Sequence, residues 1–367
     1  MKKSFGFSMA VFAVLLLFSA CMRNDDEPEF PRRPIARLYV SIEDYQRDAS
    51  QDPINNVVLI DPADTLDLPI ALNYNAGALA GAGIHFNPFL GRLLQAGYSH
   101  PGMVDTTIRL MTVGELGTLA ASGRVGYREL TAMRGIAYHH PSEMMYVANN
   151  ATPTAIYGFY RPRNQNGFTR PRKLLQLGAD MRPWGMVLWK DSLLVSNATP
   201  NNGGVSLYGN FAATDSVETN FPALSTIKIQ GATAIRGIAF VDSLDLLVLA
   251  DFGTNDNEGN PVADGRIYIV EGIKAHLATP SATVVPTRTI SGALTGLVGP
   301  VDVAIDPRGS ADRRTIFVAD RDEGKISRFK LSANGNVAPE ATVVLDETGN
   351  RRRPFGIFLD VRGVAQQ

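Results

Sequence analysis

The stretch Pro300-Val301-Asp302-Val303-Ala304-Ile305-Asp306, followed by Ile316-Phe317-Val318-Ala319-Asp320 and Gly324-Lys325-Ile326-Ser327-Arg328-Phe329, decides the fold. It contains three short apolar runs separated by turns, which is the pattern of consecutive antiparallel strands. Counterparts of the first run recur every fifty to sixty-five residues, at Gly83-Ile84-His85-Phe86, Gly135-Ile136-Ala137-Tyr138, Gly185-Met186-Val187-Leu188, Gly237-Ile238-Ala239-Phe240 and Gly356-Ile357-Phe358-Leu359.

Each middle copy is followed by a second apolar run that ends in Asn or Asp, then by a third, and then by a more alternating fourth run such as Thr226-Ile227-Lys228-Ile229-Gln230. Four short strands in a repeat slightly longer than fifty residues are typical of a β-propeller blade. Residues 36–42 read as a second strand with no first strand before them, and residues 355–361 as a first strand with nothing after it. We therefore predict an all-β fold, a six-bladed β-propeller over residues 36–363, in which the two ends of the chain complete one blade.

The quoted stretch resembles an NHL-type propeller repeat, and Arg236-Gly237-Ile238-Ala239-Phe240 with Leu249-Ala250-Asp251 is similar. The resemblance extends to six-bladed propellers of the SMP-30/gluconolactonase-like type, a group that includes binding scaffolds, lactonases and other hydrolases. Similar lactonases hold calcium on the propeller axis with acidic and amide side chains. This resemblance implies candidate metal ligands at the ends of the second strands, namely Asn149, Asn197, Asp251 and Asp320. The sequence departs from such sites in its first two blades, which offer no acidic ligand at the matched position unless Glu43 serves; in one of them Gly97 stands there.

The first residues of the chain predict export. Lys2 and Lys3 precede an apolar run from Phe5 to Phe18, and small residues lead to Cys21, as in a secretory signal. The end of this segment resembles the lipobox of bacterial lipoproteins, in which the cysteine becomes the lipidated N-terminus. We predict a signal peptide over 1–20 and lipidation of Cys21; the alternative is a plain secretory signal with an incidental cysteine.

Residues 21–35 are charged and proline-rich, which predicts a disordered acidic tether. A short acidic run after the lipidated cysteine is similar to the surface-export signal of Bacteroidota lipoproteins, although any solvated tether can be acidic. We therefore expect an outer-membrane lipoprotein of the cell envelope. The acidic run further predicts that it is exposed on the cell surface. The membrane would be contacted through the lipid, and a monomeric propeller would meet a protein or glycan partner.

Composition excludes several classes of function. The formal net charge of −1 gives no electrostatic footprint for nucleic acid. Cys21 is the only cysteine, so an intramolecular disulfide is impossible. No HExxH, Walker loop, GxSxG or CxxC motif is present.

One face of the predicted ring gathers a candidate ligand site. In a propeller blade the first strand begins, and the second strand ends, on the same face. The first-strand entries therefore bring together Arg134, Arg182, Trp184, Arg236, Arg353 and Phe355. Guanidinium groups bind carboxylates bidentately and aromatic faces accept stacking, which suits an anionic or sugar-like ligand. The alternative is structural: the Asn and Asp side chains cap turns, and the arginines pair with acids.

The loop from Asp251 to Asp264 is rich in oxygen-bearing side chains, a composition that suits calcium, although it lacks EF-hand spacing and also fits a solvated loop. The sequence leaves two functions to be distinguished, and a structural role within an envelope complex cannot be separated from the first of them by sequence. The first is a non-catalytic binding module on a lipid tether. The second is a calcium-dependent lactonase or esterase that uses the axial Asn and Asp side chains.

Overall fold

The computed structural model of the protein describes residues 34–46, 53–213, 221–347 and 349–362. The predicted signal peptide, Cys21 and nearly all of the predicted tether lie outside these residues. Residues Ile35–Arg362 form one compact unit. Among the described residues of this unit, helical structure is limited to α2 (Ile273–Leu277) and the short turns η1 (Pro162–Asn164), η2 (Asp242–Leu244) and η3 (Ala293–Thr295). Among the described residues, no helix has the length and apolarity needed to cross a membrane.

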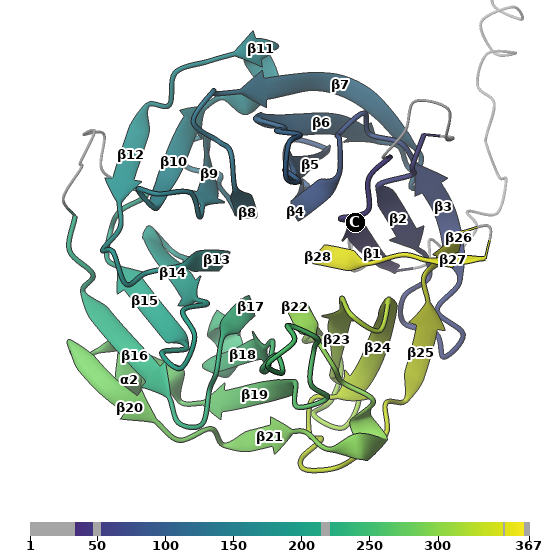
Figure 1. The fold of residues 1–367 in the computed structure, drawn as a ribbon, viewed down its shortest axis with the longest axis vertical. Coiled ribbons are helices and arrows are strands. Elements are labelled where there is room, and N and C mark those ends of the chain that lie inside the picture. The colour runs from purple at the N-terminus through teal and green to yellow at the C-terminus, as the bar shows by residue number, and fades with distance from the viewer. Residues whose placement is uncertain (1–33, 47–52, 214–220, 348, 363–367) are drawn as a thin grey trace, which may run out of the picture. The chain divides into compact units, whose positions relative to one another are not determined.

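Six antiparallel sheets are arranged around a central axis, so the predicted six-bladed β-propeller is confirmed (Figure 1). The inner strands, nearest the axis, are β4 (Gly81–Asn87), β8 (Met133–His139), β13 (Pro183–Trp189), β17 (Ile235–Val241), β22 (Pro300–Asp306) and β28 (Pro354–Arg362). The second strands are β5 (Arg92–Gly97), β9 (Met144–Asn149), β14 (Ser192–Asn197), β18 (Leu246–Asp251), β23 (Thr315–Asp320) and β1 (Ile35–Ile42).

The two outer positions of each blade complete the sheets. The third strands are β6 (Thr107–Val113), β10 (Ala155–Tyr160), β15 (Gly204–Tyr208), β19 (Arg266–Glu271), β24 (Lys325–Lys330) and β2 (Val57–Ile60). The fourth strands are β7 (Leu119–Gly126), β12 (Lys173–Gln176), β16 (Ser225–Ile229), β21 (Arg288–Ile290), β25 (Ala341–Val344) and β3 (Ile70–Tyr74). Two short strands, β11 (Gly167–Phe168) and β20 (Ser281–Val284), extend β7 and β16 in parallel, and β26 (Asp346–Glu347) pairs with β27 (Asn350–Arg351).

The closing blade is built from both ends of the unit, as predicted. β28 pairs antiparallel with β1 from Ile35 opposite Arg362 to Ile42 opposite Pro354, and β2 and β3 follow outward. The C-terminal strand thus supplies the inner position of a blade whose other strands come from the N-terminus. This pairing leaves no inner strand of the ring without a sheet partner.

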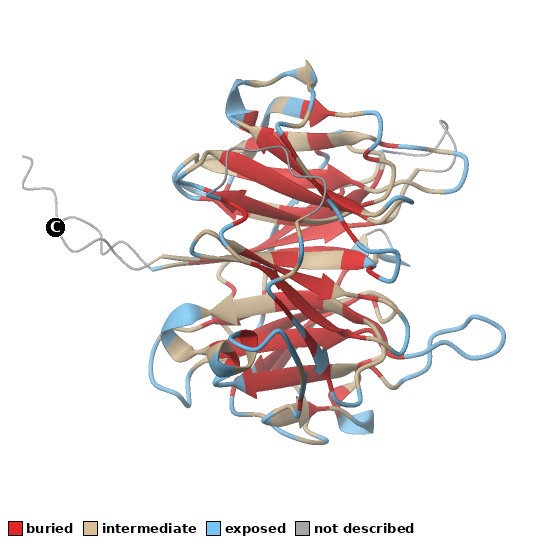
Figure 2. Cartoon of the chain, turned by 90° about the vertical axis from the view of Figure 1, so that its left-hand side faces the viewer, coloured by how far each residue is buried: buried red, intermediate tan, exposed pale blue. Residues whose placement is uncertain are grey.

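Burial follows position in the blade. The second strands β9 and β18 are buried along their full length, because both faces of each sheet contact a neighbouring blade (Figure 2). The fourth strand β16 alternates, with Ile227 and Ile229 buried and Thr226 and Lys228 exposed, as its sequence predicted. Hydrophobic clusters accordingly span two blades; one joins Leu94 of β5 to Val147 of β9. The ring is held mainly by apolar contacts between sheets, each fully buried Leu or Ile contributing about 1.5–3 kcal/mol.

Every inner strand has an irregularity in its register near its start. In β8 the pairing with β9 jumps from Met133 to Ile136, which leaves Arg134 and Gly135 out of the ladder. Such bulges change the direction in which a side chain points. Gly135 is required there, because a Cβ atom on it would lie 2.5 Å from the carbonyl oxygen of Trp184 in the next inner strand.

Candidate functional site

The bulges of three inner strands and the start of a fourth place four predicted ligand-binding residues together at one axial opening, which we call the entry face. The ring of Trp184 stacks on that of Phe355 with centroids 5.2 Å apart. The guanidinium of Arg134 lies 4.7 Å from the centre of the Trp184 ring, and that of Arg236 lies 4.3 Å from the same ring. The sequence-based grouping of these four residues therefore corresponds to direct contacts.

Two further aromatic side chains extend this arrangement. Tyr98, which follows β5, lies 5.3 Å from the guanidinium of Arg134, and Phe252, which follows β18, lies 3.2 Å from that of Arg236. Cations and aromatic rings thus alternate across neighbouring blades. We call these six residues the arginine–aromatic cluster: Tyr98, Arg134, Trp184, Arg236, Phe252 and Phe355.

The two cations of the cluster have no carboxylate partner among the described residues. Among the described residues, the guanidinium of Arg134 donates a hydrogen bond only to the carbonyl of Met133, its neighbour, and the buried Nε atoms of both Arg134 and Arg236 have no acceptor. Burial, and then the charges of Arg321 and Arg134, lower the pKa of Arg236 to about 9. A buried cation without an anionic partner is costly. The charge on Arg236 is therefore one that a bound anion would stabilise.

Acidic side chains of the entry face pair instead with two other arginines. Arg321 contacts both Glu43 and Asp322 at 2.6 Å, and Glu43 is almost completely buried. Burial lowers the pKa of Arg321, but the hydrogen bond and charge contact with Glu43 outweigh it, so that pKa is raised. Arg353, one of the predicted ligand residues, is paired with Asp44 at 3.1 Å and with Glu43 at 3.4 Å. Arg353 therefore stands apart from the arginine–aromatic cluster.

A cavity of about 350 Å³ opens beside the cluster, and we call it the arginine–tryptophan pocket. Arg182, Trp184 and Arg236 all line it, together with Phe252 and the amide side chains of Asn150 and Asn201. Arg182 is exposed, and its guanidinium makes no hydrogen bond or ion pair with any residue that the structure describes. Two arginines that have no acidic partner among the described residues, two aromatic side chains and amide groups therefore meet in one cavity.

The four candidate metal ligands share one position, the last residue of a second strand, and one structural role. Each side-chain oxygen accepts a backbone N–H from the segment that leads into the inner strand of the same blade. The oxygen-to-nitrogen distances are 2.9 Å for Asn149 and Ala132, 3.0 Å for Asn197 and Arg182, 2.6 Å for Asp251 and Ala234, and 3.0 Å for Asp320 and Gly299. A metal ion on these side chains would compete with these bonds, and calcium there stays a prediction.

The two blades that lack this Asn or Asp use another acid. In the blade that has Gly97 at this position, Asp105 accepts the N–H of Leu79 at 3.0 Å. A Cβ atom on Gly97 would lie 2.5 Å from the Asp105 carboxyl carbon, so glycine makes room for that carboxylate. In the closing blade Asp44 accepts the N–H of Arg353 at 2.6 Å. In all six blades, a side-chain oxygen thus accepts a hydrogen bond from the backbone at or before the start of the inner strand.

In the 251–264 loop, carboxylate oxygens accept hydrogen bonds from other residues of the same loop. The Asp256 carboxylate accepts the backbone N–H groups of Glu258 and Asn260, and the Asp264 carboxylate accepts both the N–H and the hydroxyl of Thr254. Within the described part of the chain, no three His, Cys, Asp or Glu side chains are grouped so that they could hold a metal ion. Calcium in this loop likewise stays a prediction.

Some residues of the entry face had no signal in the sequence. Tyr98, Phe252 and Arg321 each follow the end of a second strand by one residue, a position that the repeats do not mark. A further polar group, Asp302, did have a signal, because it stands where the other five copies of the first run have glycine. Asp302 lines a second cavity, on the axis itself.

Comparison with known proteins supports the fold. No family model and no curated protein matches the chain. Among solved structures, a chain of the nidogen/laminin complex is 14% identical with a TM-score of 0.54, covering 89% of this chain and 98% of that one. A protein from Lactobacillus plantarum is 11% identical with a TM-score of 0.53, covering 89% and 99%. A putative 6-phosphogluconolactonase from Bacteroides fragilis is 12% identical with a TM-score of 0.50, covering 92% and 99%.

At these identities the likeness shows the fold alone. The class that sequence and structure define is the six-bladed β-propeller. The resemblance to NHL-type repeats and to the SMP-30/gluconolactonase-like group stays a prediction.

Proposed function

We propose that the chain is a lipid-anchored, extracytoplasmic binding module whose propeller captures an anionic, sugar-like ligand in the arginine–tryptophan pocket. The observation that carries the proposal is the guanidinium of Arg236, which lines this pocket and has no carboxylate partner among the described residues. Arg182 offers a second cation in the same cavity, and its guanidinium has no partner in the described part of the chain. A carboxylate or phosphate group between them would receive charge-assisted hydrogen bonds.

The other walls of the pocket match the rest of such a ligand. The half-buried ring of Trp184 supplies a flat surface on which the apolar face of a sugar can stack. Asn150 and Asn201 each carry an amide that can both donate and accept hydrogen bonds with hydroxyl groups. A cavity of about 350 Å³ lies within the range of small-molecule sites.

The test is calorimetric titration of the purified full-length chain with D-glucuronate, 6-phosphogluconate and D-glucose. The name of the Bacteroides fragilis protein is the reason for including 6-phosphogluconate. We expect one of the two anions to bind and neutral glucose to bind more weakly. Arg236→Ala and Arg182→Ala should each weaken binding of that anion roughly 10- to 100-fold, the loss expected for a hydrogen bond to a charged group.

Arg170→Ala is the matched control, because Arg170 is exposed on the part of the ring near β11 and does not line this pocket. Unchanged anion affinity in the Arg182 and Arg236 variants would contradict the proposal. Each titration is repeated with EDTA, which also addresses the calcium-dependent lactonase. Loss of binding in EDTA, together with release of bound calcium, would favour that enzyme over the binding module.

The lipid anchor is a separate part of the proposal and has its own test. Cys21→Ala removes the thiol on which the lipid would be attached. We expect the variant to move from the membrane fraction to the soluble fraction of cells that express it, and to lose incorporation of radiolabelled palmitate. Retention of the variant on the membrane, or labelling that does not depend on Cys21, would show that the segment is not a lipoprotein signal.

A further inference from the structure

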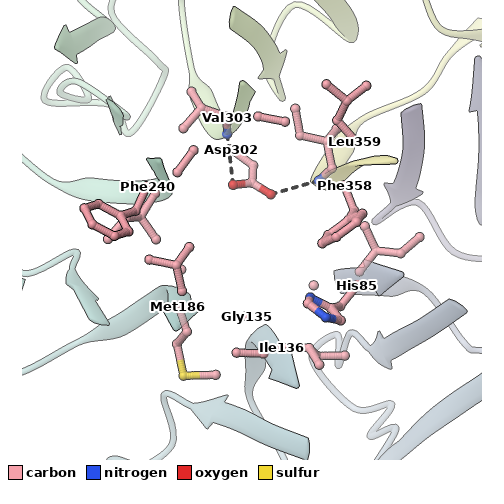
Figure 3. Close-up of a pocket in the computed structure, with 18 of the residues that line it drawn as sticks. His85, Gly135, Ile136, Met186, Phe240, Asp302, Val303, Phe358 and Leu359 are labelled. Atoms are coloured by element: carbon pink, nitrogen blue, oxygen red, sulfur yellow. Dashed lines mark hydrogen bonds between the residues drawn. The ribbon is translucent and has the colours of Figure 1, made fainter. Parts of the chain in front are cut away.

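The axis of the ring holds a second cavity, of about 330 Å³, which we call the axial channel (Figure 3). Its lining residues follow the cluster residues along the inner strands: Gly135 to Tyr138 come directly after Arg134, and Gly185 to Leu188 directly after Trp184. The channel therefore lies beyond the arginine–aromatic cluster when the inner strands are followed from the entry face. It is a different site from the arginine–tryptophan pocket and shares none of its residues.

The walls of the axial channel are mostly apolar. Ile136, Met186, Phe240, Val303 and Leu359 line it from five different blades (Figure 3). Such walls favour the apolar part of a ligand because its burial removes hydrocarbon surface from water. They do not by themselves select a ligand, so the polar groups decide its chemical class.

The one acidic side chain among the described residues that line the channel is Asp302. Its carboxylate points into the channel (Figure 3). Five inner strands have glycine at the equivalent position, and the neighbouring strands come very close there, since a Cβ atom on Gly237 would lie 2.5 Å from Cα of Asp302. Asp302 therefore places a carboxyl group at a level of the ring where the other blades have no side chain.

The carboxylate of Asp302 has no cationic partner among the residues that the structure describes. Its Oδ1 accepts the N–H of Val303 at 2.9 Å and its Oδ2 accepts the N–H of Ile357 at 2.8 Å. Each oxygen therefore keeps capacity for a further donor from the channel. Burial raises the pKa of Asp302 to about 7, which is the expected response of a carboxylate with no counter-charge.

The second titratable group that faces the channel does not supply that counter-charge. Burial lowers the pKa of His85 to about 4, so this imidazole is neutral at neutral pH. Its ring packs edge-on against Phe358 at 4.7 Å between centroids. No lysine or arginine is among the described lining residues. A bound cation would meet one carboxylate and no repelling charge in the channel.

We propose that the axial channel binds a small organic ammonium ion, with its charged group on the Asp302 carboxylate and its apolar body against the inner strands. The rings of Phe240 and Phe358 add surfaces that attract a cation. A calcium ion fits less well, because it needs six to eight oxygen ligands and the channel offers one carboxylate. A carboxylate ligand would face the charge of Asp302 across an apolar cavity.

The proposal is tested by titrating the full-length chain at pH 8 with methylammonium, n-butylammonium and benzylammonium chloride, and with benzyl alcohol and benzoate for comparison. We expect benzylammonium to bind more tightly than benzyl alcohol and benzoate. Asp302→Asn keeps the shape of the side chain and removes the charge. It should weaken benzylammonium binding at least tenfold and leave benzyl alcohol unchanged.

Two matched variants complete the design. Asp306→Asn changes an acid of the same strand that pairs with Arg308 outside the channel, and it should leave benzylammonium affinity unchanged. Asp302→Gly introduces the glycine that the other five inner strands have at this position. It replaces Asp302→Asn in the test if that variant does not fold. Absence of binding by all three ammonium ions, equal binding by the Asp302 variants, or tighter binding of benzoate would overturn the proposal. Arg236→Ala should leave the affinity for benzylammonium unchanged. The proposal for the axial channel and the proposal for the anion site are therefore tested independently.

Discussion

Asparagine in place of Asp302 is expected to change the pH dependence of folding stability by about 4 kcal/mol between pH 4 and pH 8. Burial raises the pKa of this carboxyl from its ordinary 3.8 to about 7 in the folded protein. The folded state therefore holds the proton more tightly than the unfolded state does. The resulting stabilisation is fully present below the ordinary pKa and is lost as the pH rises through about 7. Asparagine has no such proton to lose.

Urea unfolding of both proteins at pH 4, 6 and 8 measures this effect. The variant also loses an acceptor for the N–H of Val303 or Ile357, which adds a cost that does not depend on pH. The informative quantity is therefore the change with pH in the difference between the two free energies of unfolding. As the pH rises, the free energy of unfolding of the variant should increase relative to that of the parent. A difference that stays constant from pH 4 to pH 8 would show that the carboxyl titrates at its ordinary value.

Glutamine in place of Glu43 is expected to destabilise the protein by about 3–5 kcal/mol, the usual cost of removing one partner from a buried ion pair. Glu43 is almost fully buried and contacts Arg321 at 2.6 Å and Arg353 at 3.4 Å. Once Glu43 has lost its charge, Asp322 is the one acid among the described residues that still pairs with Arg321. The cluster cations also lose a nearby negative charge, since Glu43 raises the pKa of both Arg134 and Arg236.

The matched control is Glu340→Gln, because Glu340 is exposed and lies 3.7 Å from Lys330 and 3.8 Å from Arg328. That change should cost less than about 1 kcal/mol. The double variant Glu43→Gln, Arg321→Met should lose less stability than the sum of its two single variants. Additive losses, or a Glu43 variant as stable as the Glu340 variant, would show that the buried pair does not stabilise the propeller.

The fold could be predicted because its evidence is repeated along the chain. Copies of one apolar run fix the number of blades, and the unmatched runs at 36–42 and 355–361 fix how the ring closes. Both signals are local patterns of burial, which sequence reports directly. No single ambiguous strand could change the result, since the other blades impose the same period.

The site was predictable only in part, because it depends on which partner each side chain finds. Arg134 and Arg236 directly precede the glycine of their repeat, whereas Arg353 precedes Gly356 by three residues. This spacing sets Arg353 apart but does not identify its acidic partners, Asp44 and Glu43, which lie beyond the end of β1. Cluster members such as Phe252 lie in loops that the repeat does not describe.

The roles of the strand-end Asn and Asp residues also depend on the fold. Asp251 and Asp320 were candidates both for a metal and for caps, and the structure shows what their oxygens contact: backbone N–H groups of the same blade. For Asp302, the sequence showed an unusual residue but suggested no role for it. Its departure from glycine was visible in the sequence, but its meaning required knowing that the inner strands surround a cavity.

The pairing of β1 with β28 also determines the order in which the ring can be completed. Ile35 and Arg362 are opposite each other in one sheet, although nearly the whole unit separates them along the chain. Contacts over such distances form slowly, whereas the hairpins within a blade form early. During synthesis, β1 therefore has an exposed hydrogen-bonding edge until the last strand is available. A chain shortened before Pro354 would keep that edge and be prone to associate through it.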